Sequence, residues 1–429
     1  MLPRIRHYKD GDEKEIANML TKSFDTFRIF DMDGDKWLKY QEIDSGFYLH
    51  NAIIIESDDT IVGHAQIICR DLKIGESTFV RVGGVGNICV LSEYRKKGIA
   101  TMIMNYVHQC AKNLELPISA LLVQEKSGAQ SLYKKLGYNN ILTLNDICCD
   151  TEELKQKTDK SLRSNITIKP YRSGDEVGML EVYHQSGRCL SGIQKRDIEY
   201  WRRRYTSVFT YNGFFYESFD PNNVLIARKN NTICGYSFVN CVGKTGYIRE
   251  FFVLPEQEDS IPNLVNSSVN RLSSLGVNNV CFLDVIALKY EIFKNIIGHI
   301  EVRISPHDQF MARIIDLYTL MKGLEPEISE RLRKKIQSGK VLQLSVNEQE
   351  ITIIINNGMQ LCKERFEKYD ITYTFDEECF LKLLFGVISV DKAMNEKNVS
   401  VSPNSNTSIK ILELMFPKKN FCMCIGDVW

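Results

Sequence analysis

The sequence predicts a mixed α+β protein, with mixed sheets and flanking helices, that is divided into three domains. A chain of 429 residues is too long for one hydrophobic core, because single cores stop growing at about 250–300 residues. The pattern of residues 5–13 returns at residues 168–176, which indicates two related units. From about Met311 the apolar pattern changes, which indicates a third unit.

The two copies of the repeat share the order of a short strand, a Gly-Asp turn and an amphipathic helix. The first copy reads IRHYKDGDE and the second reads IKPYRSGDE. Apolar residues at helical spacing follow each turn, namely Ile16, Met19 and Leu20, and then Val177, Leu180 and Tyr183. Residues 150–163 between the copies are almost wholly polar, which predicts an exposed linker. The expected first two domains are therefore residues 1–155 and 165–308.

The third domain is expected at residues 311–429. Strand-like runs at residues 341–344 and 351–355 are followed by a helix-like run at residues 377–385. Gly386 stands where a glycine commonly ends a helix. These features predict a further α+β domain.

Composition and charge argue against several classes of partner. The 54 Lys and Arg residues equal the 54 Asp and Glu residues, so no global field would draw the chain to nucleic acid or to an anionic membrane. The basic run at residues 202–204 is therefore interpreted as a solvated or interface helix face. No stretch reaches the ~18 apolar residues of a membrane span, and the first residues lack the apolar core of a signal peptide. We expect a cytoplasmic protein.

The cysteines predict a reducing compartment. Their number, 13, is odd. Most lie in apolar runs, where a reduced thiol behaves as a small core residue, as expected for Cys69, Cys89, Cys281 and Cys379. The close pairs at residues 148–149 and 422–424 have neither the C-x-x-C spacing nor a nearby His of a zinc site, so no metal is expected.

The most informative segment is NICVL at residues 87–91, followed by RKKGIA at residues 95–100 and a helical pattern. A strand, a basic turn and a helix N-terminus can hold a pyrophosphate, because unpaired amides and the positive end of the helix dipole meet the phosphates. Gly98 allows close backbone approach, and the neighbouring basic side chains add charge. The alternative is a solvated basic turn that enters an ordinary helix.

This segment resembles motif A, R/Q-x-x-G-x-G/A, of the GNAT N-acetyltransferases. Further along, the apolar run at residues 121–123 and AQSLYKKLGY at residues 129–138 resemble the strand and the A-x-x-L-Y-x-x-x-G-F/Y helix and turn of that family. One departure is Lys126, where many members have Asn at a cofactor contact. The resemblance implies a GNAT fold that uses acetyl-CoA as a co-substrate.

The resemblance also implies roles for individual residues. In the family the strand before motif A splays from its neighbour, and its backbone binds the pantetheine arm and the acetyl carbonyl; by match, Ile88 and Val90 hold these positions. The remaining cofactor residues by match are Arg95, Lys96, Lys97, Gly98, Ile99 and Ala100. Attack by a neutral amine on the thioester needs a polarised carbonyl, a proton acceptor and a donor for the leaving thiolate.

Tyr133 matches the family's usual donor. An unperturbed tyrosine has a pKa of ~10 and is therefore protonated at pH 7. The alternative is a half-buried helix tyrosine that packs on the sheet.

The second copy is expected to have lost the cofactor site. Aligning Leu91 with Leu254 places Glu258 and Asp259 in the basic turn, where two carboxylates would repel a pyrophosphate. Ile261 stands at the position of the glycine and would block close backbone approach. We expect one active site per chain.

One active and one degenerate acetyltransferase domain, followed by an α+β domain, is similar to the Eis (enhanced intracellular survival) family, whose third domain resembles the sterol carrier fold. The matching segments are MARIID at residues 311–316 and LMFP at residues 414–417. The resemblance implies a homo-oligomer, a hexamer. It also implies a general base, the α-carboxylate of the last residue, here Trp429. A carboxyl of pKa ~3.3–3.7 is a weak base that would mainly orient the amine, and the alternative is a frayed tail.

The acceptor site is expected near residues 31–42, which border it in GNAT folds. These residues partly match a calcium-binding loop, but Lys36 stands where such a loop needs glycine, so calcium is not expected. Asp31, Asp33 and Asp35 would attract a cationic substrate, and the alternative is an exposed acidic loop.

The sequence therefore predicts an acetyl-CoA-dependent N-acetyltransferase. The acceptor would be a primary amine of a small cationic molecule, aminoglycoside-like or polyamine-like, or a lysine side chain, acetylated by direct attack. Two other functions stay open: a protein that only binds acetyl-CoA, and a lipid or small-molecule carrier that uses the third domain. The sequence does not identify the acceptor or the position acetylated.

Overall fold

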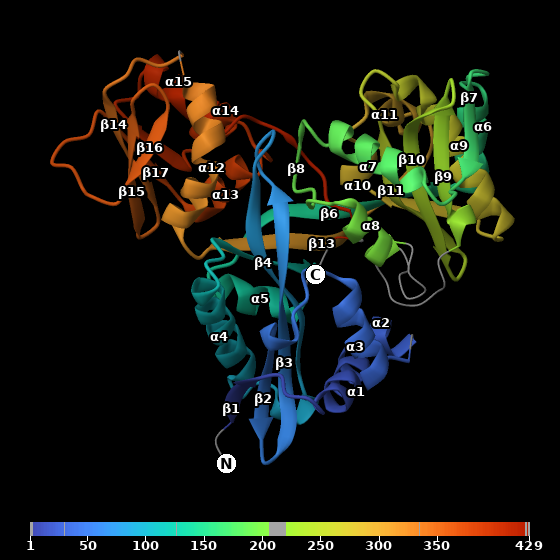
Figure 1. Cartoon of the computed structure of the whole chain (residues 1–429), viewed down its shortest axis with the longest axis horizontal. Helices are drawn as coiled ribbons and strands as arrows, with labels where there is room; N and C mark the ends of the chain where they lie inside the picture. The colour runs from blue at the N-terminus through green and yellow to red at the C-terminus, as the bar shows by residue number, and fades with distance from the viewer. Residues whose placement is uncertain are drawn as a thin grey trace.

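The computed structural model describes residues 3–29, 31–125, 127–205, 220–333 and 335–424, together with Asp427. Figure 1 shows three lobes, with the first in blue, the second in green and yellow, and the third in orange and red. In the described part of the chain the strands form a 12-stranded sheet, a five-stranded sheet and a two-stranded sheet. The large sheet runs through the first and second lobes, so these two lobes share one continuous sheet.

The first lobe is a sheet with helices on both faces. Its strands are β1 (Arg4–His7), β2 (Ala52–Ser57), β3 (Thr60–Lys73), β4 (Phe79–Val90), β5 (Ile118–Gln124) and β6 (Asn139–Asp150). Its helices are α1 (Glu13–Ser23), α2 (Asp25–Ile29), α3 (Gly34–Ile43), α4 (Ile99–Asn113) and α5 (Gly128–Lys135), with short 3₁₀ turns η1 (Leu49–Asn51) and η2 (Ser92–Tyr94). Because side chains alternate along a strand, Ile54 packs with α1 on one face and Ile53 packs with α4 on the other.

The second lobe repeats this architecture. Its strands are β7 (Ile166–Pro170), β8 (Leu190–Ser191), β9 (Val224–Lys229), β10 (Thr232–Val242), β11 (Thr245–Val253), β12 (Asn279–Leu283) and β13 (Val302–Ile314). Its helices are α6 (Thr151–Asp159), α7 (Asp175–Ser186), α8 (Ile198–Tyr205), α9 (Ile261–Ser274), α10 (Asp284–Ala287) and α11 (Glu291–Ile297), with η3 (Pro221–Asn223) and η4 (Glu258–Ser260).

The predicted internal repeat is confirmed in detail. In the first copy the hydroxyl of Tyr8 donates to Glu13 at 3.0 Å, and in the second the hydroxyl of Tyr171 donates to Glu176 at 2.8 Å. The turn glycine of each copy adopts a left-handed conformation, with φ of +102° and +101°. A strand, a turn and a helix of the same kind therefore open both lobes.

The expected exposed linker between the copies is wrong, because a packed helix occupies most of it. Asp150 caps α6 by accepting from two backbone amides, and Leu154 of that helix is fully buried. The helix packs against α9 of the second lobe. Leu154 and two threonines at helical spacing, Thr151 and Thr158, form the buried face of this largely polar helix.

Two long strands, β6 and β13, are exchanged between the lobes and cross the centre of Figure 1. The second half of β13 lies between β5 and the first half of β6, in the first lobe. The second half of β6 lies between β12 and the first half of β13, in the second lobe. The boundary expected at residues 308–311 falls inside β13, so each lobe completes its sheet with a strand half from the other.

The third lobe is an α+β unit. Its elements are α12 (Leu317–Leu332), β14 (Lys340–Val346), β15 (Gln349–Ile355), β16 (Met359–Cys362), β17 (Ile371–Phe375), α13 (Glu377–Leu384), α14 (Val390–Asn395), β18 (Val399–Ser402) and α15 (Asn406–Met415). The predicted strand pair and the predicted helix are confirmed as β14, β15 and α13, and Gly386 follows that helix with φ of +69°. The chain then returns to the second lobe, where β19 (Asn420–Phe421) pairs with β8.

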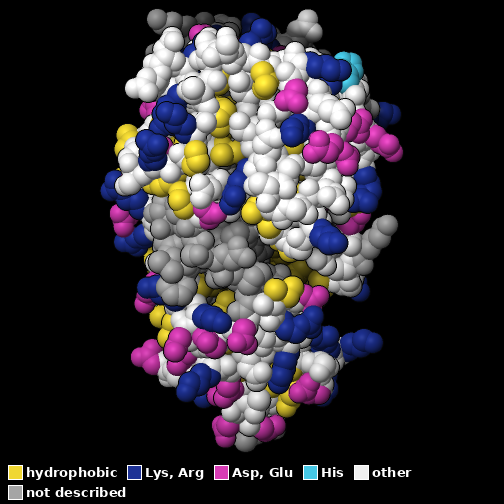
Figure 2. Space-filling view, turned by 90° about the vertical axis from the view of Figure 1, so that its right-hand side faces the viewer, with side chains coloured by type: hydrophobic (Ala, Val, Ile, Leu, Met, Phe, Trp, Pro, Cys, Tyr) yellow, Lys and Arg dark blue, Asp and Glu magenta, His cyan; other side chains and the backbone are white. Residues whose placement is uncertain are grey.

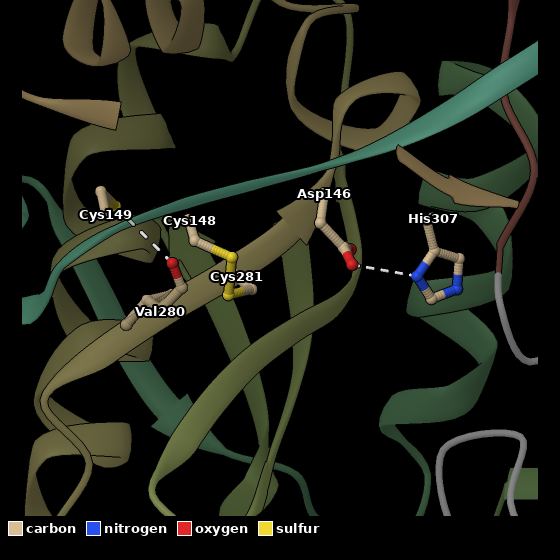
Figure 3. Close-up of a disulfide and its surroundings, with 6 residues drawn as sticks. All are labelled: Asp146, Cys148, Cys149, Val280, Cys281 and His307. Atoms are coloured by element: carbon tan, nitrogen blue, oxygen red, sulfur yellow. Dashed lines mark hydrogen bonds and ion pairs between the residues drawn. A yellow bond between two sulfur atoms is a disulfide. The ribbon is translucent and has the colours of Figure 1, made fainter. Parts of the chain in front are cut away.

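A disulfide joins Cys148 of β6 to Cys281 of β12, so the expectation that Cys281 is a reduced core thiol is wrong in this structure. Figure 3 shows the pair directly opposed on neighbouring strands, with Cys149 beside it. The bond links the exchanged half of β6 to the sheet that receives it. Within the described residues, no helix is long and apolar enough to cross a membrane.

Candidate active site

A pocket of about 600 Å³ lies in the first lobe where β4, α4 and α5 meet. It is lined by Ser23, Phe24, Ile88, Cys89, Val90, Tyr94, Arg95, Lys96, Gly98, Ile99, Ala100, Thr101, Gly128, Ala129, Leu132 and Tyr133. Eight residues predicted from two separate sequence motifs therefore share one pocket. Lys97 is not among the lining residues; its ammonium group lies 5.0 Å from the centre of the Tyr94 ring.

The last part of β4 is free of pairing with its parallel neighbour. β4 and β5 pair from Val82 with Ile118 to Gly84 with Ala120, and their pairing ends there. A register shift against β3 follows, where Asn87 has φ of +57°. The segment that carries Ile88 and Val90 therefore leaves β5 and turns its backbone toward the pocket.

The basic turn has the geometry needed to hold phosphates. Gly98 precedes α4 with φ of +81°, a conformation that favours glycine, and a Cβ built there would meet nothing within 4 Å. No described side chain caps the first turn of α4, so its amides are available to an anion. Arg95, Lys96 and Lys97 are exposed around this turn. The residues present fit the pyrophosphate of coenzyme A.

Tyr133 extends from α5 into the same pocket and is mostly buried, at 7 % exposure. Burial raises the pKa of its phenol to about 12. The hydroxyl is therefore protonated at pH 7 and able to donate a proton. The ring also packs edge-on to Tyr138 at 6.0 Å, so part of the packing role considered as the alternative is present as well.

Asp31, Asp33 and Asp35 do not line this pocket. They line a separate groove of about 810 Å³ between α1 and the start of α3, together with basic residues of α1 and α2. Asp33 accepts from the Lys36 amide at 2.8 Å and so caps α3. From Gly34 onward the partial calcium-loop match is helix, so its carboxylates are not arranged as in a calcium loop.

Trp429 and Lys126 lie outside the described residues, so their predicted roles stay predictions. Asp427, two residues before the end of the chain, is buried at 3 % exposure and held from both lobes. Its carboxylate accepts from Arg196 at 2.7 Å and from the Tyr200 hydroxyl at 2.8 Å. Its backbone carbonyl accepts from Arg70 of β3 at 2.8 Å. The C-terminal segment is therefore fixed where the first two lobes meet.

This anchor was missed in the sequence, because each of its residues is an ordinary charged residue far from the others along the chain. Arg196 also forms two hydrogen bonds with Glu250, at 2.6 and 2.8 Å. Arg70 forms two with Asp44, at 2.7 and 2.6 Å. Buried ion pairs are retained where their geometry is good and their remaining hydrogen bonds are satisfied.

The basic run on α8 takes part in ion pairs. Arg202 pairs with Glu176 at 3.2 Å, and Arg203 pairs with Glu199 at 2.8 Å; the side chain of Arg204 lies outside the described residues. On the face drawn in Figure 2, basic and acidic side chains are interspersed. Arg202 and Arg203 are therefore half-exposed and ion-paired, which fits either a solvated or an interface helix face.

Comparisons with known proteins agree with this geometry. Residues 4–141 match the model of the acetyltransferase (GNAT) domain family. A provisionally named acetyltransferase of Bacillus subtilis (strain 168) is 27 % identical over 124 residues, which cover 25 % of this chain and 83 % of that protein.

Three solved structures share the fold over nearly the whole chain. A conserved protein of Enterococcus faecalis V583, described as a probable N-acyltransferase, has a TM-score of 0.68 at 16 % identity and covers 98 % of this chain and 97 % of its own. A GCN5-related N-acetyltransferase of Anabaena variabilis has 0.67 at 15 %, covering 98 % and 99 %. Eis1 of Mycobacterium abscessus has 0.59 at 12 %, covering 100 % of both chains. At these identities the likeness shows the fold alone.

Proposed function

We propose that this chain acetylates a primary amine with acetyl-CoA by direct attack. The starting point is the match of residues 4–141 to the GNAT acetyltransferase domain, which makes the chain an N-acetyltransferase of that class. The observation that carries this proposal is the convergence of a splayed strand, a basic glycine turn at a helix N-terminus and a buried tyrosine on one pocket. Acetyl-CoA supplies an activated thioester. The protein has to bind it, polarise its carbonyl and manage two protons.

We propose that the backbone at Ile88 and Val90 binds the acetyl carbonyl and the pantetheine arm. The phosphates would be held by the turn and the first helical residues, Arg95, Lys96, Lys97, Gly98, Ile99 and Ala100. Support comes from the free edge of β4 and from the uncapped start of α4, since oriented amides stabilise negative charge without reorganisation.

Tyr133 is the proposed general acid. As the amine nitrogen bonds to the acetyl carbon, the carbon–sulfur bond breaks and the thiolate takes the tyrosine proton. Its phenol is protonated at pH 7 and lines the pocket together with the proposed cofactor residues, which supports this role.

The proposed proton acceptor on the amine side is the terminal carboxylate of Trp429, acting directly or through water. The fixed position of Asp427, two residues before Trp429 in the sequence, supports this proposal.

The finer identity is also a proposal. The domains would be residues 1–155, 165–308 and 311–429, with the second domain inactive and the third sterol-carrier-like, as in the Eis family. We propose a cytoplasmic homo-oligomer, by resemblance a hexamer, without a metal. The acceptor would be a small amine, aminoglycoside-like or polyamine-like, or a lysine side chain. Asp31, Asp33 and Asp35 would contribute by attracting a cation toward the lobe.

The experiment that tests the function measures free thiol release from acetyl-CoA by the full chain, with a panel of aminoglycosides, polyamines and lysine peptides. Amine-dependent release is expected. Binding of acetyl-CoA by calorimetry without release for any amine would overturn catalysis and favour a binding protein. Absence of binding would overturn the cofactor site itself, and lipid carried through purification would then favour a carrier.

A further inference from the structure

Four polar side chains are buried between α3 and β3, on the face of the first sheet that α1 also covers. Trp37 and Gln41 lie one turn apart on α3, and His64 and Gln66 point the same way from β3 because residues two apart share a strand face. None is more than 6 % exposed. We call these four residues the polar row.

The polar row carries several atoms that have no hydrogen-bond partner among the described residues. They are Trp37 Nε1, Gln41 Oε1 and Nε2, His64 Nε2 and Gln66 Oε1. Buried polar side-chain atoms are usually hydrogen-bonded, because the desolvation cost is otherwise uncompensated. Five such atoms on two neighbouring elements have hydrogen-bonding capacity that no described residue uses.

Two of these side chains are fixed at one end and leave the other end unpartnered. Gln66 Nε2 donates to the Tyr48 carbonyl at 3.0 Å, and His64 Nδ1 lies 2.9 Å from the Asn87 carbonyl. A carbonyl can only accept, so Nδ1 carries the proton and Nε2 is a bare acceptor. Burial lowers the pKa of His64 to about 4, so this imidazole is neutral at pH 7.

The polar row lies between the cofactor pocket and the anchored end of the chain. His64 pairs directly with Cys89, which lines the pocket between Ile88 and Val90. Six residues further along the same strand face, about 20 Å away, Arg70 bonds the carbonyl of Asp427. None of the four residues lines that pocket itself, so an acceptor would reach the polar row from the His64 side of β4.

The charges on this face do not suit a polycation. Its buried carboxylate, Asp44, forms two hydrogen bonds with Arg70. Asp31, Asp33 and Asp35 line the other groove, together with Lys14, Lys22 and Arg28. The polar row itself combines a bare nitrogen acceptor, amide groups and the indole donor, which together match a hydroxyl group that both donates and accepts.

We propose that the polar row binds a hydroxyl group of the acceptor, so that, among the amine classes proposed above, hydroxyl-bearing monoamines are preferred over polyamine-like acceptors. The hydroxyl would donate to His64 Nε2 or Gln66 Oε1 and accept from Trp37 Nε1 or Gln41 Nε2. This inference rests on the proposed function and names the substrate class of the same site.

The test measures how fast the full chain acetylates matched amines with acetyl-CoA. Serinol is compared with 3-aminopentane and ethanolamine with propylamine, since each pair differs by replacing hydroxyl with methyl; spermidine represents polyamines. The readout is the ratio of kcat/KM within each pair for wild type, His64→Leu and Gln41→Met. Dividing the ratio of each variant by that of wild type cancels the effect of the different basicities of the amines. We expect both variants to lose about tenfold in preference for the hydroxyl amine over the alkyl amine.

Tyr236→Phe is the matched control. Tyr236 is the second-lobe counterpart of His64 and is equally buried. Its substitution by Phe also removes a hydrogen bond, the one to Glu250. Its preference should equal that of wild type. Gln41→Met keeps side-chain length, so it remains informative if His64→Leu does not fold.

The outcomes separate the inference from the function. Turnover with unchanged preference in both variants, or faster turnover of spermidine in every protein, would overturn the polar row and leave catalysis intact. If no amine is turned over, calorimetry of serinol against 3-aminopentane with the coenzyme A-bound protein gives the same comparison. Equal affinities there would overturn the inference.

Discussion

The two related lobes differ in what occupies the same groove. In the first, the end of β4 borders a pocket of about 600 Å³ that continues to Gly98. In the second, an offset of 163 residues matches Val90 to Val253, whose amide donates to the Tyr290 hydroxyl at 2.8 Å. Ile261, at the place of the glycine, is fully buried. The same fold therefore has an open groove in the first lobe and a groove filled by side chains in the second.

The two lobes also differ on the sheet face that carries His64 in the first lobe and Tyr236 in the second. In the second lobe the Tyr236 hydroxyl donates to Glu250, which Arg196 also bonds, and Asp427 of the returning tail completes the network. In the first lobe His64 stands at the corresponding position, and its Nε2 has no partner among the described residues. The buried polar groups of the second lobe are thus hydrogen-bonded to Asp427 of the tail, whereas His64 Nε2 of the first lobe has no partner among the described residues.

The sharpest test of this comparison is Tyr133→Phe, for which we expect kcat to fall by about 10²–10⁴-fold. The change removes the proton donor and keeps the ring, so acetyl-CoA affinity by calorimetry should stay near that of wild type. Tyr290→Phe alters the hydroxyl that fills the second groove and should leave kcat unchanged. A Tyr133→Phe enzyme with normal kcat would assign the tyrosine to packing alone.

Asp427→Asn tests how much the bonds of the tail carboxylate to the second lobe stabilise the fold. The change removes a buried charge that faces Arg196, and breaking such a pair costs about 3–5 kcal/mol in the free energy of unfolding. Chemical denaturation measures this loss. Asp220→Asn is the control, because its pair with Arg271 is partly exposed and should cost less than about 1 kcal/mol. Equal losses for the two variants would show that the anchor has no special role.

The buried imidazole of His64 predicts sensitivity to acid. The pKa is lowered to about 4 in the folded chain, so the unfolded chain binds the proton first as pH falls from about 6.5. The contribution of His64 to the free energy of unfolding is therefore fully present above pH 6.5, and roughly 3 kcal/mol of it is lost by pH 4.

Denaturation of wild type and His64→Gln at pH 7 and pH 4 measures this difference. The variant should lose less stability than wild type between the two pH values. Equal losses would assign the acid sensitivity to other groups, such as His108, whose pKa burial also lowers to about 4.

The local parts of the site were predictable from the sequence. The turn at Gly98, the start of α4 and the position of Tyr133 follow from short contiguous motifs, because strand, turn and helix are set by neighbouring residues. The paired strands and helix of the third lobe followed in the same way. The repeat was readable because both copies need a glycine of positive φ before a helix.

The long-range parts were not predictable. The insertion of β13 between β5 and β6 joins residues almost two hundred positions apart, and no local pattern specifies such a partner. The same holds for Cys148 with Cys281 and for Asp427 with Arg196. His64 and Gln66 were detectable in the sequence, because two polar residues on one face of an otherwise apolar strand predict buried hydrogen-bonding groups.

The smallest expected effect concerns Gly98, whose substitution would make the first lobe more like the second. Gly98→Ala places a side chain at φ of +81° and narrows the approach to the phosphates, so we expect acetyl-CoA affinity to fall about tenfold by calorimetry. Gly243→Ala is the matched control, because that glycine also has a positive φ of +60° and open space around its Cβ position, but lies in the second lobe.

The two glycine variants should lose similar stability in a thermal melt, since the backbone strain is of the same kind. Only Gly98→Ala should weaken acetyl-CoA binding. If both variants bind acetyl-CoA like wild type, close backbone approach at the turn is not what distinguishes the lobes. The difference in acetyl-CoA binding between the lobes would then come entirely from the groove, which is open beyond Val90 in the first lobe and closed by Tyr290 in the second.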